Sequence, residues 1–385
     1  MDPGAVTNII VVLFAIICLY GVFKCHNLYK KHDDLRYIVL LSILLLAFAD
    51  VWISYYGGNV SSFFSEYRFL FTLIPLAVYG FYAWSEKRHH KEAEEKKKIK
   101  AAFQQYLMPA VIEEMLKDPS KLKLGGQKRN LAIMFSDIRG FTTLSEKLTP
   151  EELTSFLNEY LDAMTNIVLE NRGTVDKYIG DAIMCFWGAP ISDPEHIRLA
   201  VKTSVEMMDK MHELRLDWKV RGLPDIDIGI GINSGDVVVG NMGSHKRFDY
   251  TCLGDHVNLA SRLEGLNKMY GCHIIVSENV YPIIAKDYVT RELDLVTVKG
   301  KKQPITIYEV IGKKVQKKNA DFLIAYNKGL AHFKKRDFKQ AKTYFESALK
   351  SRDDVHTKTY IDRCKGYAKT PPPKDWNGVT EIKTK

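Results

Sequence analysis

The chain has 385 residues, of which 46% are hydrophobic and 26% are charged, and its formal net charge is +9. This length is enough for about two or three domains. The six cysteines form no CxxC pair, which argues against a disulfide or zinc framework and indicates free thiols in a reducing compartment. The positive charge leaves two classes of partner to weigh, nucleic acid and a membrane surface.

Three apolar runs fill residues 1–85, namely Ala5–Phe23, Tyr37–Tyr56 and Phe69–Trp84. Each is close to the roughly 20 residues that a transmembrane helix needs. Basic residues gather after the first and third runs, and the positive-inside rule then places the N-terminus outside and everything after Glu86 in the cytoplasm. The sequence therefore predicts a multi-pass segment in the cell membrane. Basic residues beside membrane lipid explain much of the positive net charge, so a nucleic-acid partner is not needed to explain it.

Asp50 is an ionisable residue within the second run. It is either a proton or ligand sensor, or a residue near the outer headgroups beside the aromatic belt of Trp52, Tyr55 and Tyr56. The second reading is preferred.

Residues 86–125 form the predicted linker. Its first part is dense in Glu and Lys around a sparse apolar stripe, which indicates a helix that continues from the third run until Pro109. A dimeric coiled coil and a solvated charged helix are both compatible with this stripe, because it covers too few heptads to decide.

Strands and long helices alternate in residues 126–312. The pattern predicts strands at 131–135, 174–178, 182–187, 226–232 and 237–242, and helices at 150–170 and 192–221. Thr149 and Glu152 predict a capping box for the first helix. Two hairpins are expected, one turning at Gly180-Asp181 and one at 233–236. Together these elements predict an α+β fold close to a ferredoxin-like core.

Two carboxylates stand out in this region. Asp137 follows the first strand, and Asp181 lies in the first hairpin turn, so both reach one end of the sheet. Two carboxylates at one place can bind a pair of divalent cations that polarise a phosphoryl group and activate an attacking oxygen. The pattern favours phosphoryl or nucleotidyl transfer.

Four motifs in order carry a family resemblance: FSDIRGFT from Phe135, KYIGDAIMCFWG from Lys177, GIGINSGDVVVGNMGS from Gly229 and YTCLGDHVNLASRLEGL from Tyr250. From Arg129 to about Gly312 the chain resembles the catalytic domain of class III nucleotide cyclases. The resemblance implies a homodimer in which each active site is shared between two subunits.

One subunit, by this resemblance, holds two Mg²⁺ or Mn²⁺ ions through Asp137, Asp181 and the carbonyl of Ile138. Its backbone amides would cradle the triphosphate, at Arg139, Gly140, Phe141 and Thr142. A lysine near the end of the domain, Lys301 in preference to Lys299, would contact the outer phosphates.

The other subunit would read the base through Lys177 and Thr251, orient the ribose through Asn258 and stabilise phosphate charge through Arg262. Lysine and threonine suit adenine, whereas family members that select guanine usually carry Glu and Cys there. The resemblance thus implies an adenylate cyclase that acts on ATP, and the predicted spans of residues 1–85 would anchor it in the membrane. The alternatives are a guanylate cyclase and a catalytically silent membrane receptor that uses the fold to dimerise.

Residues 313–385 follow the catalytic region. Ala320–Leu349 matches the spacing of two short helices of a single tetratricopeptide repeat. One repeat cannot bury its own apolar face, so it docks either within this protein or on a protein partner. The tail beyond Thr370 is expected to be extended and to pack on the domain through Trp376.

Overall fold

The computed structural model describes residues 124–298, 303–313 and 317–382, and six single helical residues before them. The chain divides into two compact units, Met1–Tyr106 and Leu107–Lys385. The three predicted membrane spans and nearly all of the linker lie outside the described residues. Within the described part, no helix is both long enough and apolar enough to span a bilayer.

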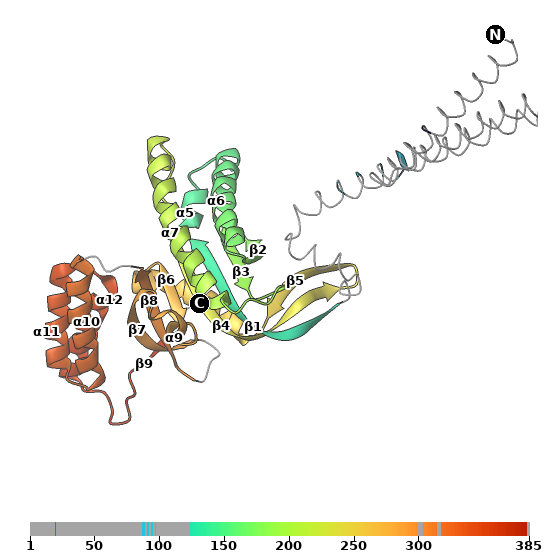
Figure 1. The fold of residues 1–385 in the computed structure, drawn as a ribbon. Helices are drawn as coiled ribbons and strands as arrows, with labels where there is room; N and C mark the ends of the chain where they lie inside the picture. The colour runs from blue at the N-terminus through green and yellow to red at the C-terminus, as the bar shows by residue number, and fades with distance from the viewer. Residues whose placement is uncertain are drawn as a thin grey trace, which may run out of the picture. The chain divides into compact units, whose positions relative to one another are not determined.

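The described strands form one sheet in the order β2-β3-β1-β4-β6-β8-β7-β9, with β5 paired to β4 (Figure 1). Their bounds are β1 Gly125–Ile138, β2 Thr174–Ile179, β3 Ala182–Trp187, β4 Ile228–Ser244, β5 Arg247–Leu253, β6 Ile274–Ser277, β7 Val289–Val298, β8 Ile305–Gly312 and β9 Val379–Ile382. The predicted α+β class is confirmed for this domain.

The helices between these strands cover both faces of the sheet. Their bounds are α5 Phe141–Ser145, α6 Pro150–Glu170, α7 His196–Val220, α8 Asp255–Tyr270 and α9 Tyr281–Ile284. Alternate residues of β1 separate the two layers, because Ala132 and Met134 pack with α6 and α7 whereas Leu131 and Ile133 pack with the start of α8. Figure 1 shows α6 and α7 side by side.

Two local predictions for the domain are confirmed. Thr149 caps α6 with the expected reciprocal bonds, since its hydroxyl accepts from the amide of Glu152 at 3.2 Å and its amide donates to the Glu152 carboxylate at 2.9 Å. The four described cysteines are buried free thiols: Cys185, Cys252, Cys272 and Cys364.

The predicted turn at residues 233–236 is wrong. These residues lie inside β4, which pairs with β1 without interruption from Ile228 to Asn241. The polar side chains of this stretch are satisfied within the fold: Ser234 donates to the carbonyl of Leu131 at 3.0 Å, and Asn233 accepts from Ser277 at 2.7 Å. Turn-forming residue types therefore sit in a strand because distant partners take up their hydrogen bonds.

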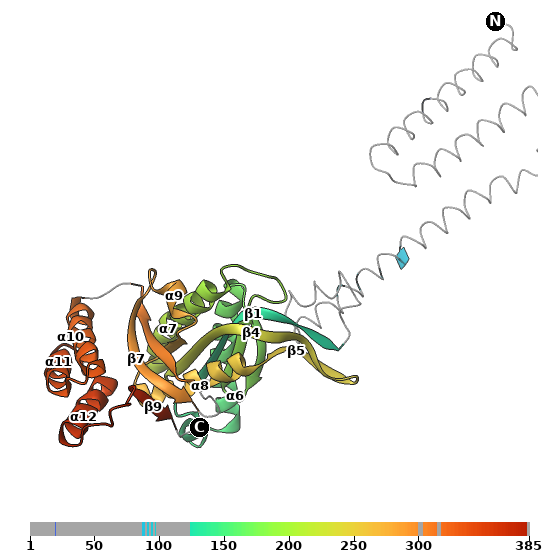
Figure 2. The same cartoon turned by 90° about the horizontal axis from the view of Figure 1, so that it is seen from below.

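Three helices follow the catalytic domain, α10 Lys317–Lys334, α11 Phe338–Ser351 and α12 Val355–Lys369. The first two cover the segment predicted as a helical pair, and the third was not predicted. They enclose their own apolar core and lie together beside β7 (Figures 1 and 2). The likeness to a tetratricopeptide repeat, and a protein partner for it, stay predictions.

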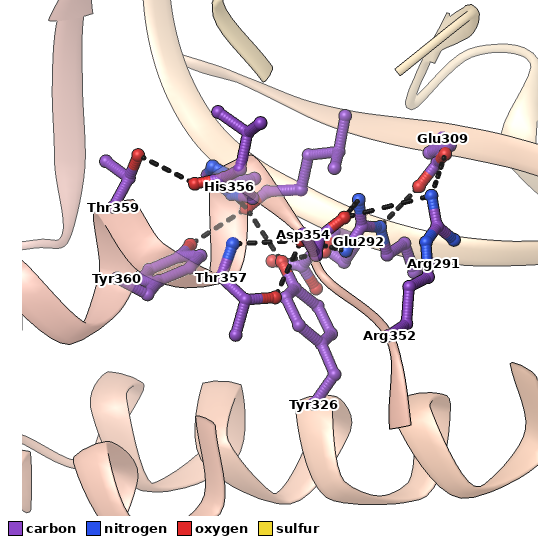
Figure 3. Close-up of polar contacts among 12 residues, drawn as sticks. Arg291, Glu292, Glu309, Tyr326, Arg352, Asp354, His356, Thr357, Thr359 and Tyr360 are labelled. Carbon is purple, nitrogen blue, oxygen red and sulfur yellow. Dashed lines mark hydrogen bonds and ion pairs between the residues drawn. The ribbon is translucent and has the colours of Figure 1, made fainter. Parts of the chain in front are cut away.

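A buried ion network joins these helices to the sheet (Figure 3). Arg291 of β7 is fully buried, contacts Asp354 through two hydrogen bonds of 2.8 Å, and also bonds Glu309 of β8. The tail packs through Trp376, but against Phe333 and Phe338 of the helices and not on the catalytic domain as predicted. Beyond it, β9 adds to β7 in parallel. The helical segment thus docks within this chain.

Candidate active site

The two carboxylates predicted from the sequence lie together. Asp137 is the penultimate residue of β1, and Asp181 lies in the turn that joins β2 to β3, the strand beside β1. Burial and then the adjacent Asp181 carboxyl raise the pKa of Asp137 from 3.8 to about 7. Among the described residues, the Oδ2 atom of Asp181 is buried and has no hydrogen-bond partner.

This arrangement fits divalent cations. Two adjacent carboxylates repel each other when both are ionised, and hard cations such as Mg²⁺ prefer carboxylate and carbonyl oxygens. No group of three or more His, Cys, Asp or Glu side chains is arranged to hold a metal within the described chain. Any ion here would therefore rest on Asp137 and Asp181 together with non-side-chain oxygens, for which the carbonyl of Ile138 stays the predicted candidate.

Glu264 is a third carboxyl group near this pair, and the sequence reasoning missed it. It lies on α8, and its pKa is raised from 4.5 to about 7 by burial and then by the charge of Asp137. Because Glu264 is two residues beyond Arg262, the two side chains point to different sides of the helix. The sequence offers no other indication that Glu264 belongs to the site, and this spacing does not predict that it lies near Asp137.

The segment after Asp137 turns at Gly140, which has a φ of 70° and directly precedes α5. A left-handed conformation at this place favours glycine. The amide of Arg139 donates to the carbonyl of Asp227 at 2.8 Å, and its guanidinium bonds the carbonyl of Cys272. The Arg139 amide is thus taken up within this chain, and its contact with a triphosphate stays a prediction. The amides of Gly140, Phe141 and Thr142 stay candidates.

Lys177 and Thr251 are brought together although they are far apart in the sequence. Asp176, which neither composition nor motif singled out, connects them. The Thr251 hydroxyl donates to Asp176 Oδ2 at 2.5 Å, and Lys177 Nζ lies 3.2 Å from Asp176 Oδ1. The register of β2 against β3 shifts between Val175 and Lys177, so Asp176 is the extra residue of a β-bulge. Bulges of this kind re-aim side chains next to active sites.

Asn258 and Arg262 lie one turn apart on α8, on one face of the helix as predicted. Asn258 is exposed and Arg262 is partly exposed, whereas the residues that directly follow them, Leu259 and Leu263, are buried. An exposed polar face on a helix whose other face is anchored in the core is suited to contact something outside this chain. Lys299 and Lys301 lie outside the described residues.

Comparisons with known proteins agree with this geometry. Residues 125–312 match the family model described as "Adenylate and Guanylate cyclase catalytic domain". An adenylate cyclase of Anabaena cylindrica is 42% identical over 189 residues, covering 47% of this chain and 37% of that protein. Adenylate cyclase 1 of Rhizobium meliloti is 37% identical over 186 residues, covering 48% of this chain and 28% of that protein.

One solved structure, a bacterial light-regulated adenylyl cyclase, superposes with a TM-score of 0.50 at 26% identity, covering 60% of this chain and 66% of that one. The chain spans well under two thirds of the length of the two curated relatives. The similarity thus concerns the catalytic domain.

Proposed function

With a cyclase catalytic domain at residues 125–312, we propose that this chain is an adenylate cyclase that converts ATP to cyclic AMP and pyrophosphate. The observation that carries the proposal is the adjacent, half-buried pair of Asp137 and Asp181, with one oxygen of Asp181 left without a partner in the described chain. Relatives named as adenylate cyclases support the choice of reaction.

Asp137 and Asp181 would hold two divalent cations. Bound there, such ions lower the pKa of the ribose 3′-hydroxyl and neutralise charge on the phosphates. The backbone amides of Gly140 to Thr142, in the same subunit as these two carboxylates, would bind the triphosphate of ATP. The hydroxyl oxygen attacks the α-phosphorus, the bond to the β-phosphate oxygen breaks, and pyrophosphate leaves.

A second copy of the chain would complete the site. Its Lys177 would donate to N1 of adenine, and its Thr251 would accept from the 6-amino group. Its Asn258 would orient the ribose, and its Arg262 would stabilise the charge that builds on the transferring phosphate. The exposed polar face of α8 supports this division, because Asn258 and Arg262 point away from the core of their own subunit.

The sequence of residues 1–85 supports a membrane anchor for this enzyme, with three spans and the catalytic domain in the cytoplasm. Such an anchor would hold two chains together near a lipid surface.

The direct test is turnover by the purified full chain with Mn²⁺ and either ATP or GTP. We expect cyclic AMP from ATP, and Asp137→Ala is expected to reduce the rate at least about 100-fold, since it removes one of the two metal-binding carboxylates. Thermal unfolding of the variant controls for loss of fold. Cyclic GMP as the main product would instead assign a guanylate cyclase. Absence of both products, with the dimer intact, would favour the silent receptor.

A further inference from the structure

We propose that Asp176 is a positioning residue that sets base selectivity by fixing the direction of the Thr251 hydroxyl hydrogen. The inference rests on the proposed function, because it assigns a role within the same adenine-reading cluster. Asp176 would touch no substrate atom. It would act through Thr251 and Lys177.

The geometry of Asp176 leaves Thr251 one orientation. The Asp176 side chain is fully buried, and its Oδ2 atom accepts the hydrogen of Thr251 Oγ1 at 2.5 Å. The amide of Cys252 donates to the same oxygen at 3.4 Å. Burial raises the pKa of Asp176 from 3.8, whereas its contacts with Thr251, Lys177 and the Cys252 amide favour the charged form. As a carboxylate, Asp176 has only acceptor sites, so a hydroxyl at hydrogen-bond distance from it must act as the donor. The remaining polar surface of Thr251 Oγ1 is then its lone pairs.

The other oxygen of Asp176 holds Lys177. Lys177 Nζ lies 3.2 Å from Oδ1, and 39% of the lysine side chain is exposed. An ammonium group has three N–H donors and no acceptor. Paired with Asp176 by charge, Lys177 keeps N–H donors for another group. One buried carboxylate thus orders a partly exposed donor, Lys177, beside an acceptor, Thr251, of which 5% is exposed.

This donor and acceptor pair matches adenine and opposes guanine. Adenine presents a 6-amino donor, whereas guanine presents the acceptor O6 at the same position. Lone pairs of Thr251 facing O6 would leave a buried acceptor unsatisfied, which is the kind of mismatch that gives strong discrimination. If the threonine hydroxyl were free to rotate, it would donate to O6 and accept guanine. Selectivity therefore depends on Asp176 as much as on Thr251.

Asp176→Asn tests the inference with little change of shape. The new side-chain carbonyl is expected to face the Lys177 ammonium, which needs an acceptor, so the new amide N–H groups face Thr251 and the long bond of 3.4 Å from the Cys252 amide is lost. In that variant the Thr251 hydroxyl accepts from the amide and points its own hydrogen outward. We expect the ratio of kcat/KM for GTP to that for ATP to rise at least about tenfold, the effect of one exchanged hydrogen bond. Asp176→Leu, which also frees the hydroxyl, is expected to raise the same ratio.

Two controls separate this role from a structural one. In a Thr251→Val background the hydroxyl is absent, so Asp176→Asn is expected to leave the GTP to ATP ratio unchanged. Equilibrium binding of ATP and GTP in the presence of Mn²⁺ gives a second reading of the ratio that does not need turnover.

The outcomes are distinct. A raised ratio that disappears in the Thr251→Val background supports the inference. Equal losses with ATP and GTP, or the same raised ratio without the Thr251 hydroxyl, overturn it while leaving the adenylate cyclase intact. A wild-type protein that itself prefers GTP overturns the proposed function, and the inference with it, and this is seen before any variant is made.

Discussion

Gly231 of β4 lies directly against the backbone of α8. A Cβ atom at Gly231 would lie 2.1 Å from the backbone nitrogen of Glu264 and 2.5 Å from the carbonyl oxygen of Ala260. Both atoms belong to the backbone of α8, so no side-chain rotation relieves the clash. The absent side chain thus sets the position of the helix that carries Asn258 and Arg262.

We expect Gly231→Ala to displace α8, to lower the free energy of unfolding by about 1–3 kcal/mol as overpacking does, and to reduce cyclase activity. Chemical denaturation and turnover of the full chain measure the two effects. Gly265→Ala is the matched control, because Gly265 lies on the same helix with no atom within 4 Å of the added Cβ. A fully active and stable Gly231→Ala protein would contradict this packing.

For single residues, the sequence predicts those that stand in a recognisable local pattern. Asp137 and Asp181 follow strands and stand beside turns, and Lys177 and Thr251 lie in motifs. Asp176 and Glu264 could not be predicted, because a charged residue in a strand or helix is ordinarily solvated. Their partners are distant in the sequence: Thr251 is 75 positions from Asp176. The same non-local effect explains the misassigned turn at 233–236.

Among the elements, α12 depends on charges that the sheet supplies. Its N-cap is Asp354, which accepts from the amide of Thr357 at 2.9 Å while bonding Arg291 of β7. The Arg291 guanidinium also lies 5.1 Å from the ring of Phe322 and 4.9 Å from that of Tyr326, both on α10. One arginine therefore ties a strand to two helices, as Figure 3 shows in part.

Arg291→Met is expected to destabilise the protein by about 3–5 kcal/mol, since it removes the buried guanidinium that bonds both Asp354 and Glu309. The two carboxylates would keep the more distant Arg352, at 3.8 Å and 3.6 Å. Denaturant unfolding measures the loss. Lys365→Met is the control, because Lys365 pairs only with exposed Asp362 on the surface of α12 and its loss is expected to have no measurable effect. Equal stability of the two variants would contradict the role of the network.

His356, also on α12, makes stability depend on pH. Burial lowers its pKa from 6.5 to about 4, and its ring bonds the Leu293 carbonyl at 2.8 Å. The unfolded chain takes up this proton near pH 6.5 but the folded chain only near pH 4, so stability falls as pH falls through that window. The full loss is at most about 3 kcal/mol.

The variant His356→Gln keeps a donor for Leu293 and does not titrate, so we expect a flatter dependence of unfolding free energy on pH between about 6.5 and 4. The titration of Asp354 falls below this pH range. Despite its burial, the hydrogen bonds from Arg291 and Thr357 lower its pKa from 3.8 to about 2, so its contribution is lost at lower pH. An unchanged slope in the variant would show that His356 is not the source.

For the whole molecule, the sequence predicts the catalytic domain well and its C-terminal extension in part. The helical pair follows from apolar spacing, whereas the packing of Trp376 was expected from the family resemblance. The third helix and β9 do not, because α12 relies on the buried charge of Arg291 and β9 on the free edge of β7. The predicted membrane spans lie outside the described residues and rest on the sequence.

Two copies of the chain are expected to share each active site. In each site, one subunit would contribute Asp137 and Asp181, and the other subunit would contribute the exposed α8 residues Asn258 and Arg262. A variant in either half is then expected to inactivate the enzyme on its own, whereas a mixed dimer would keep one site in which every residue is intact.

Cyclic AMP formation by Asp137→Asn and Arg262→Ala, each alone and after coexpression in equal amounts, decides whether the site is shared. We expect each variant to be nearly inactive alone and coexpression to restore about a quarter of wild-type activity, because half of the dimers are mixed and each has one intact site. No recovery, with mixed dimers demonstrated by differently tagged chains, would contradict a shared site.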